Sequence, residues 1–275
     1  MPEGSRSLGM NIPHRDFLLD VIMGRMEGYT PAFAVGVTPN LDAVDGTVTL
    51  WDGADYGAAG GGIVVPLTVG TNLYISSSSA ADTAVTVLVE GLDANHVEQV
   101  LTVAVNGQTQ VLIGNFIHVQ VATVVAGNPA GDLYIATSTA LTGGVPNTKT
   151  TIKSKVIQGK NITHNCFYMV PAGKGAIIMS IRGSTNSNRD ALVTTHLTYL
   201  NQPKVEFISY DIASWVQWGS PTPIATRDAA GNRFIIIPEK SFLEYRVSVE
   251  DNNTRTFFSF DMVLVDNQQF NIAEV

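Results

Sequence analysis

Residues 85–107 read VTVLVEGLDANHVEQVLTVAVNG, and this stretch decides the fold class. Val85, Val87 and Val89 occupy alternate positions, which is the pattern of a strand with one buried face. Residues 90–96 are rich in turn formers, and the alternation resumes over residues 97–105. The stretch therefore predicts two antiparallel strands joined by a turn.

The same pattern continues on the C-terminal side of this stretch. Asn106-Gly107 precedes a second apolar run at 111–113, and Asn-Gly between alternating runs is a strong hairpin signal. Further strands are expected at 117–121 and 133–137, which would extend the hairpins into a meander. Short strands at such regular spacing are typical of a β-sandwich or a β-barrel.

The C-terminal part of the chain has the same character. Strands are expected at 162–170, 176–182, 192–200, 234–237, 245–249 and 258–264, with a longer irregular insertion over 203–223. Alternation is cleanest in the last two strands, which indicates an antiparallel sheet with one core face and one wet face. We expect an all-β chain with two antiparallel β-sandwich domains, of jelly-roll or Ig-like type, after a short N-terminal helix.

Charge divides the chain into three blocks. Residues 1–30 carry a net charge of -1, residues 31–150 carry -8, and residues 151–275 carry +1. Lys149 is the only Lys or Arg in the middle block, which ends at a Gly-Gly-Val-Pro-Asn turn at 143–147. The predicted domains are a helical arm at 1–30, an acidic β-domain at 31–150 and a C-terminal β-sandwich at 151–275.

The arm contains the one convincing helix. Its apolar residues share one face at helical spacing; they are Phe17, Leu18, Val21 and Ile22. A helix this short is marginal in water by itself, so its apolar face must dock on another surface. Docking on its own domain and docking on a partner subunit or particle both remain open.

Composition excludes several functional classes. The net charge of -8 argues against general binding to nucleic acid, which requires clustered Lys and Arg. No run of about 18 apolar residues predicts a membrane span, and no secretory leader is recognisable, so synthesis in a cytoplasm is expected. Cys166 is the only cysteine, which excludes an intramolecular disulfide and a Cys-rich zinc site.

Enzymatic motifs are missing as well. The chain has no Gly-x-Ser-x-Gly elbow, no His-Glu-x-x-His and no Walker loop, so we expect no enzyme and no catalytic or cofactor-binding residues. His164 and Cys166 would share a strand face, but a buried structural cysteine is the commoner state. Glu206 with Asp211 is the one weak acid pair for a glycan hydrolase, and the remaining histidines lack metal-ligand spacing.

Two clusters remain open as binding sites. Asp42, Asp45, Asp52 and Asp55 could hold Ca²⁺, although Asp-Gly pairs are also ordinary turn formers and the spacing differs from the twelve-residue calcium loop. Tyr210, Trp215 and Trp218 in the expected insertion could form a sugar platform or anchor a subunit interface. No metal or cofactor is assigned from these patterns.

Several stretches resemble virion structural proteins of tailed bacteriophages. The resemblance covers roughly 65–265 and rests on LVEGLDAN at 88–95, GNPAGDLYI at 127–135, YMVPAGK at 168–174 and IPEKS at 237–241. These are turn-and-strand patterns, and the family has no catalytic residues to transfer.

The resemblance implies a capsid-decorating (cement or head-fibre), minor capsid or tail component, assembled in the host bacterial cytoplasm. Its implied partners are other copies of itself, as a homotrimer, and the major capsid protein or other virion proteins, without nucleic acid or membrane. Phe17, Leu18, Val21 and Ile22 would then dock on the particle. The alternative is a tail or tail-fibre protein that binds a host surface glycan through the Trp215 loop.

Overall fold

The computed structural model describes residues 17–53, 62–185, 191–199, 205–211, 222–224 and 236–267. Within them the regular structure is almost entirely β-strand; the exceptions are helix α1 (Phe17–Ile22) and the 3-10 turns η2 (Ala43–Asp45) and η3 (Lys149–Thr151). The predicted all-β chain with a short N-terminal helix is confirmed. None of the helices in the described ranges has the length and apolar character needed to cross a membrane.

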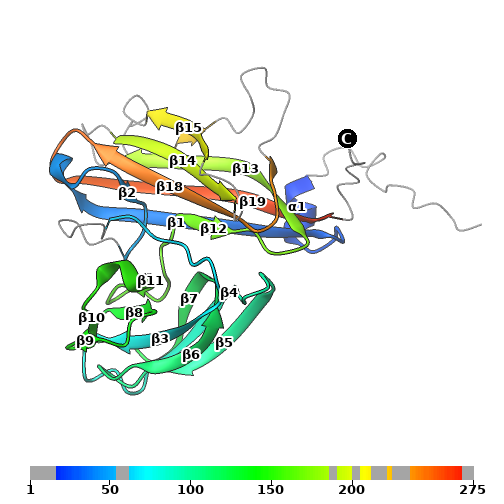
Figure 1. Ribbon diagram of the computed structural model, residues 1–275. Coiled ribbons are helices and arrows are strands. Elements are labelled where there is room, and N and C mark those ends of the chain that lie inside the picture. The colour runs from blue at the N-terminus through cyan, green and yellow to red at the C-terminus, as the bar shows by residue number, and fades with distance from the viewer. Residues whose placement is uncertain are drawn as a thin grey trace, which may run out of the picture.

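Two sheets contain the N-terminal and C-terminal strands (Figure 1). The first has the spatial order β1 (Tyr29–Leu41), β19 (Thr254–Asp266), β13 (Lys174–Thr185) and β16 (Thr222–Ile224), with β17 (Ile236–Ile237) also beside β13. The second has the order β12 (Phe167–Met169), β18 (Ser241–Val249), β14 (Ala191–Tyr199) and β15 (Val205–Asp211), with β2 (Val48–Thr49) also beside β18. We call these two sheets the large sheet pair.

Pairing within the large sheet pair is nested. Eight of its ten described strands, all except the short β12 and β17, are in chain order β1, β2, β13, β14, β15, β16, β18 and β19. The first pairs with the eighth, the second with the seventh, the third with the sixth and the fourth with the fifth, all antiparallel. These are the pairings of one long hairpin, and the further contacts β13–β19 and β14–β18 show that this hairpin is wrapped around a core.

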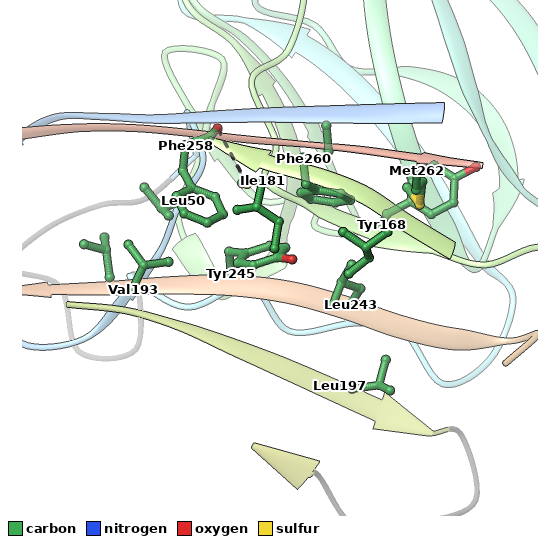
Figure 2. Packing of buried hydrophobic residues seen from close by; sticks show 14 of the residues in the cluster. Leu50, Tyr168, Ile181, Val193, Leu197, Leu243, Tyr245, Phe258, Phe260 and Met262 are labelled. Carbon is green, nitrogen blue, oxygen red and sulfur yellow. Dashed lines mark hydrogen bonds between the residues drawn. The ribbon is translucent and has the colours of Figure 1, made fainter. Parts of the chain in front are cut away.

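One hydrophobic cluster fills the space between these two sheets. Alternate residues Phe258, Phe260 and Met262 of β19 point towards β18, as Figure 2 shows. The ring of Tyr245 on β18 lies 4.7 Å from that of Phe258 and 4.9 Å from that of Phe260, measured between centroids. The alternation that predicted these two strands therefore places their apolar sides face to face.

The remaining strands form a second, smaller assembly, which we call the small sheet pair. One sheet has the order β11 (Ile152–Val156), β8 (Leu133–Ala136), β3 (Thr71–Ser77) and β6 (Val111–Phe116), and the other has β5 (Glu98–Ala104), β4 (Thr86–Leu92) and β7 (His118–Ala126). β9 (Leu141–Thr142) and β10 (Val145–Pro146) form a separate two-stranded ribbon. A hydrophobic cluster that includes Val87, Val103 and Leu133 lies between the two sheets.

The hairpin predicted from 85–107 is confirmed, but its extension is not. β4 and β5 pair in register, and the Asp93 carboxylate accepts hydrogen bonds from the backbone N–H groups of Asn95 and Val97 in the turn between them. Asn106-Gly107 does form a turn, closed by the hydrogen bond from Thr109 N to Asn106 O. The expected hairpin beyond this turn is wrong, because β6 crosses to the other sheet and pairs with β3 instead of β5.

The strand pairing also differs from the charge-based division of the chain. β1 and β2 come from the predicted acidic block, yet they pair with β19 and β18 from the C-terminal block. The small sheet pair is thus an insertion between β2 and β12. The charge change near residue 150 lies close to the end of this insertion, whereas its beginning has no comparable change. Residues 203–223, expected to be irregular, contain β15 and part of β16.

Two smaller clusters join the parts of the molecule. Trp51, Phe167 and Phe242 from the large sheet pair pack with Leu92, Ile117, Tyr134 and Ile152 from the small sheet pair, and we call this set the joining cluster. Helix α1 packs on the outer face of β19 through Val21, which contacts Val263 and Val265. Figure 1 shows the resulting arrangement, with the large sheet pair stacked on the small one.

Candidate functional site

A groove lies beside the joining cluster, where strand β1 faces the small sheet pair. It encloses about 630 Å³. One wall is formed by Thr30–Val35 of β1, and the opposite wall carries side chains of β4, β5 and β7. Residues 162–165, with Phe167 and Tyr168 of β12, close the end. The volume is in the range of sites that bind ligands or peptide segments.

The polar groups of the groove are acidic or neutral. Glu90 and Glu98 line it, and no Lys or Arg is among the described residues that do so, although Lys174 just outside the lining pairs with Glu98 at 3.1 Å. Tyr168 is largely buried between these carboxylates, and burial, together with the negative charges of Glu98 and Glu90, raises the pKa of its hydroxyl. A positively charged ligand would therefore be favoured over a negatively charged one.

An ionic cluster holds the rim of the groove at His164. The Asp52 carboxylate, whose side chain has no exposed surface, lies 2.7 Å from His164 Nδ1 and 3.2 Å from Lys160 Nζ. Asp52 also accepts a hydrogen bond from the backbone N–H of His164. The cluster ties the segment after β2 to the segment before β12, which are the two chain connections between the sheet pairs. Since its members pair with one another, a positioning role for this cluster is the simplest account.

The three described aspartates among those considered for Ca²⁺ do not converge. The Asp42 carboxylate accepts a hydrogen bond from the backbone N–H of Asn253, and the Asp45 carboxylate accepts one from the backbone N–H of Asp42. The Asp52 carboxylate contacts the ring of His164 instead. Asp55 lies outside the described residues. No group of three or more His, Cys, Asp or Glu side chains in the described ranges is placed to hold a metal ion.

Cys166 is separated from any reactive partner. Its side chain is fully buried, burial raises the pKa of the thiol well above its usual value, and Sγ lies 3.7 Å from the carbonyl oxygen of Phe258. His164 is engaged by Asp52 instead. Sequence reasoning missed this pairing because the two residues are 112 positions apart and no local pattern connects them.

The predicted docking face of the helix is divided by the structure. Val21 is buried against its own sheet, whereas Ile22 is exposed together with Leu19 and Met23. Phe17 and Leu18 lie in α1, but their side chains are outside the described part. Of the predicted set, Val21 is thus not available to a partner while Ile22 is, and Leu19 of α1 and Met23 directly after the helix are exposed beside it.

The predicted aromatic loop cannot be placed in full. Tyr210 lies in β15 opposite Val193 of β14, and Trp215 and Trp218 fall outside the described residues. Glu206 and Asp211 are also in β15, where they stand opposite His196 and Leu192.

Comparison with known proteins adds little. No family model matches the chain, and no curated protein does. Among solved structures, a crystal structure of the infectious bursal disease virus VP2 subviral particle is 10% identical, with 94% of this chain and 79% of that chain covered and a TM-score of 0.24. A structure of the Gt strain of the same virus is 10% identical, with 92% and 78% covered and a TM-score of 0.23. At these values the likeness carries no argument about fold or function.

Proposed function

We propose that the chain is a non-enzymatic structural component of a virion. The observation that carries this proposal is the nested pairing of eight of the ten described strands in the large sheet pair, from β1 with β19 to β14 with β15. This pairing is similar to the winding of a jelly roll, an architecture used by viral capsid proteins and also by lectins and cupins. Because one fold serves several functions, the pairing supports the proposal together with a second argument.

The second argument is the resemblance to virion proteins of tailed bacteriophages. Its four stretches fall on turns and strand ends that set the two sheet pairs: residues 88–95 cover the β4–β5 turn, 127–135 enter β8, 168–174 join β12 to β13, and 237–241 join β17 to β18. Within that family we favour a minor capsid or capsid-decorating protein, of the cement or head-fibre kind, assembled in the cytoplasm of the host bacterium.

The proposed partners are copies of the same chain, as a homotrimer, and the major capsid protein or another virion protein. Leu19 and Ile22 of α1 and Met23 directly after it are each more than half exposed, which is costly for a helix that a neighbour does not cover. We assign the contact with neighbouring virion proteins to this side of α1.

Immunogold electron microscopy of intact particles with an antibody to this chain tests the proposal. Label over the head supports a decorating protein. Label confined to the tail contradicts it and favours the alternative, a tail protein that binds host glycan through the loop of Trp215 and Trp218. Particles without label contradict a virion role altogether.

The role of α1 has its own test. The double substitution Leu19→Ser and Ile22→Ser should reduce incorporation into particles at least tenfold while the sheets stay folded, since both side chains are more than half exposed and the residues before α1 are kept. Incorporation is measured by quantitative immunoblotting of purified particles, and folding by far-ultraviolet circular dichroism. The matched control is the variant Val44→Ser, at an exposed valine far from α1 in sequence. Normal incorporation of the double variant would contradict the assignment.

A further inference from the structure

The groove runs along the open edge of β1. This strand lies at the end of its sheet, with β19 as its only partner among the described strands. Gly28 O accepts a hydrogen bond from the N–H of Asp266 directly opposite, which fixes the alternation along the ladder. Backbone groups of even-numbered residues therefore face β19, and those of Pro31, Phe33 and Val35 face the other side.

The position of Pro31 agrees with this alternation. Proline has no N–H to donate, so it is tolerated where its nitrogen faces away from the neighbouring strand. Phe33 and Val35 then each offer an N–H and a C=O towards the groove. An extended segment in the groove could pair with these groups and add a strand to the sheet.

The two walls together present exposed apolar side chains, and carboxylates lie next to them on the wall of β4 and β5. Val100 of β5 is 58% exposed and Phe33 of β1 is 67% exposed. Glu90 of β4 stands between Val100 and Val121 on the neighbouring strands. A fitting segment would carry apolar residues at alternate positions and positive charges at its ends.

One segment of this chain has that pattern. Leu8, Met10 and Ile12 alternate with Gly9 and Asn11, and Arg6 and Arg15 flank the run. Residues 6–12 in extended form span roughly 20 Å, about the length of the β1 edge along the groove. Charge complementarity with Glu90 favours this segment over the acidic remainder of the chain, and Glu98, which already pairs with Lys174, keeps that end of the groove from repelling a second cation strongly.

We propose that residues 5–16 of a second copy occupy the groove as an added strand on the β1 edge. This inference rests on the proposed function, because only a protein that assembles with other copies needs such a contact. It also identifies a second copy of the chain as one of the neighbours of α1. An exchanged strand covers a sheet edge that would otherwise be open. If each copy gives its strand to the next around a closed ring, the copies are joined without any additional contact surface between them.

Site-directed crosslinking in the full chain tests the occupant. In a Cys166→Ala background, one preparation carries Met10→Cys and a second carries Val100→Cys; the two are mixed and treated with a short bismaleimide. A covalent dimer containing one chain of each kind is the expected product. The same two cysteines placed in one chain distinguish the source: a crosslink formed within single chains, with no mixed dimer, would mean that each segment fills its own groove and would overturn the proposal.

A pair of matched valine variants tests the groove. Val100→Arg adds bulk and a positive charge to the wall and should shift the midpoint of self-association, measured by sedimentation velocity, at least tenfold in concentration. Val125→Arg is the control, because Val125 is 53% exposed on a strand of the same sheet but does not line the groove. Equal effects of the two variants, or no effect of either, would refute the groove as the contact.

A synthetic peptide of residues 4–15 gives a third measurement. It should bind the variant that lacks residues 1–16 and compete with assembly, whereas a peptide with Arg6→Glu and Arg15→Glu should bind at least tenfold more weakly. Equal binding of the two peptides would exclude charge recognition by the groove. If particles are labelled in the immunogold experiment while these assays fail, the virion role stands and only the exchanged strand is disproved.

Discussion

The imidazole ring of His118 is enclosed by the joining cluster. It lies 5.5 Å from the ring of Phe167 and 5.5 Å from that of Phe242, and its Nε2 has no hydrogen-bond partner. Burial lowers the pKa of His118 to about 3, and the positive charges of His96 and Lys153 act in the same direction while Gln120 opposes them. His96, at the turn before β5, also has its pKa lowered, first by burial and then by Lys240.

The lowered pKa of His118 predicts that the free energy of unfolding falls in acid. The unfolded chain protonates His118 near pH 6.5 and the folded chain only near pH 3, so stability is complete above pH 6.5 and falls as the pH drops through that window. The expected loss between pH 7 and pH 5 is about 2 kcal/mol, at about 1.4 kcal/mol per pH unit below 6.5. Urea unfolding at both pH values measures it.

The variant His118→Phe should remove most of this pH dependence, because it leaves no group to protonate at that position. His164→Phe is the control, since His164 lies at the partly exposed rim and pairs with Asp52. If the free energy of unfolding of His118→Phe still falls by the wild-type amount between pH 7 and pH 5, the buried imidazole is not the cause.

At the scale of single elements, β1 depends on a close approach at Gly36. A Cβ atom there would lie 2.2 Å from the carbonyl oxygen of Leu50 and 2.5 Å from Cβ of Cys166. Gly36→Ala should therefore push β1 away from the segments that follow β2 and precede β12, at a cost of about 3 kcal/mol. Thermal unfolding measures this loss.

Gly159→Ala is the matched control for this substitution. Gly159 has φ +78 and open space around the Cβ position, so only backbone strain is added, about 1 kcal/mol. A smaller loss for Gly36→Ala than for Gly159→Ala would show that β1 can adjust.

The strands were predictable from the sequence where alternation was strict. Residues 85–105, 245–249 and 258–264 become β4, β5, β18 and β19, because their period-two apolar residues each face one core. Partner choice was not predictable in the same way. Asn106-Gly107 specifies a turn, but whether β6 then pairs with β5 or β3 depends on burial across the small sheet pair, which no local pattern encodes.

The candidate site was largely invisible in the sequence for the same reason. The groove combines Thr30–Val35 with residues near 90, 100, 121 and 164, which no spacing rule connects. Val21 shows a smaller version of this difficulty. Helical periodicity places Val21 on the apolar face of the helix. Only the position of β19 shows that this side chain is buried within its own molecule and is not available to a partner.

At the scale of the whole molecule, the joining cluster should make the two sheet pairs unfold together. Phe167 is its central ring, 5.8 Å from the ring of Trp51 and 5.8 Å from that of Phe242. Phe167→Ala removes about 3–5 kcal/mol of packing from this contact. Differential scanning calorimetry should then resolve two transitions where the wild-type chain gives one.

Val87→Ala is the control for this experiment, since Val87 belongs to the core of the small sheet pair alone. This substitution should lower the free energy of unfolding by about 1–3 kcal/mol. The large and small sheet pairs should still unfold in one transition, unlike the two transitions expected for Phe167→Ala. A single transition in Phe167→Ala would show that the two chain connections and the Asp52 cluster suffice for cooperativity.

The nested pairing has a mechanical consequence. The first residue of β1 lies opposite the end of β19, at the pair Tyr29 and Val265, so a load applied through both ends of the described chain enters at one corner of the sheet. Force in that direction opens the ladder one hydrogen bond at a time, as in a zipper, instead of shearing all of them at once. The protein should thus unfold at low force when its two ends are pulled apart. A particle under tension would therefore have to be attached to this protein in a way that does not pull on both ends of the chain.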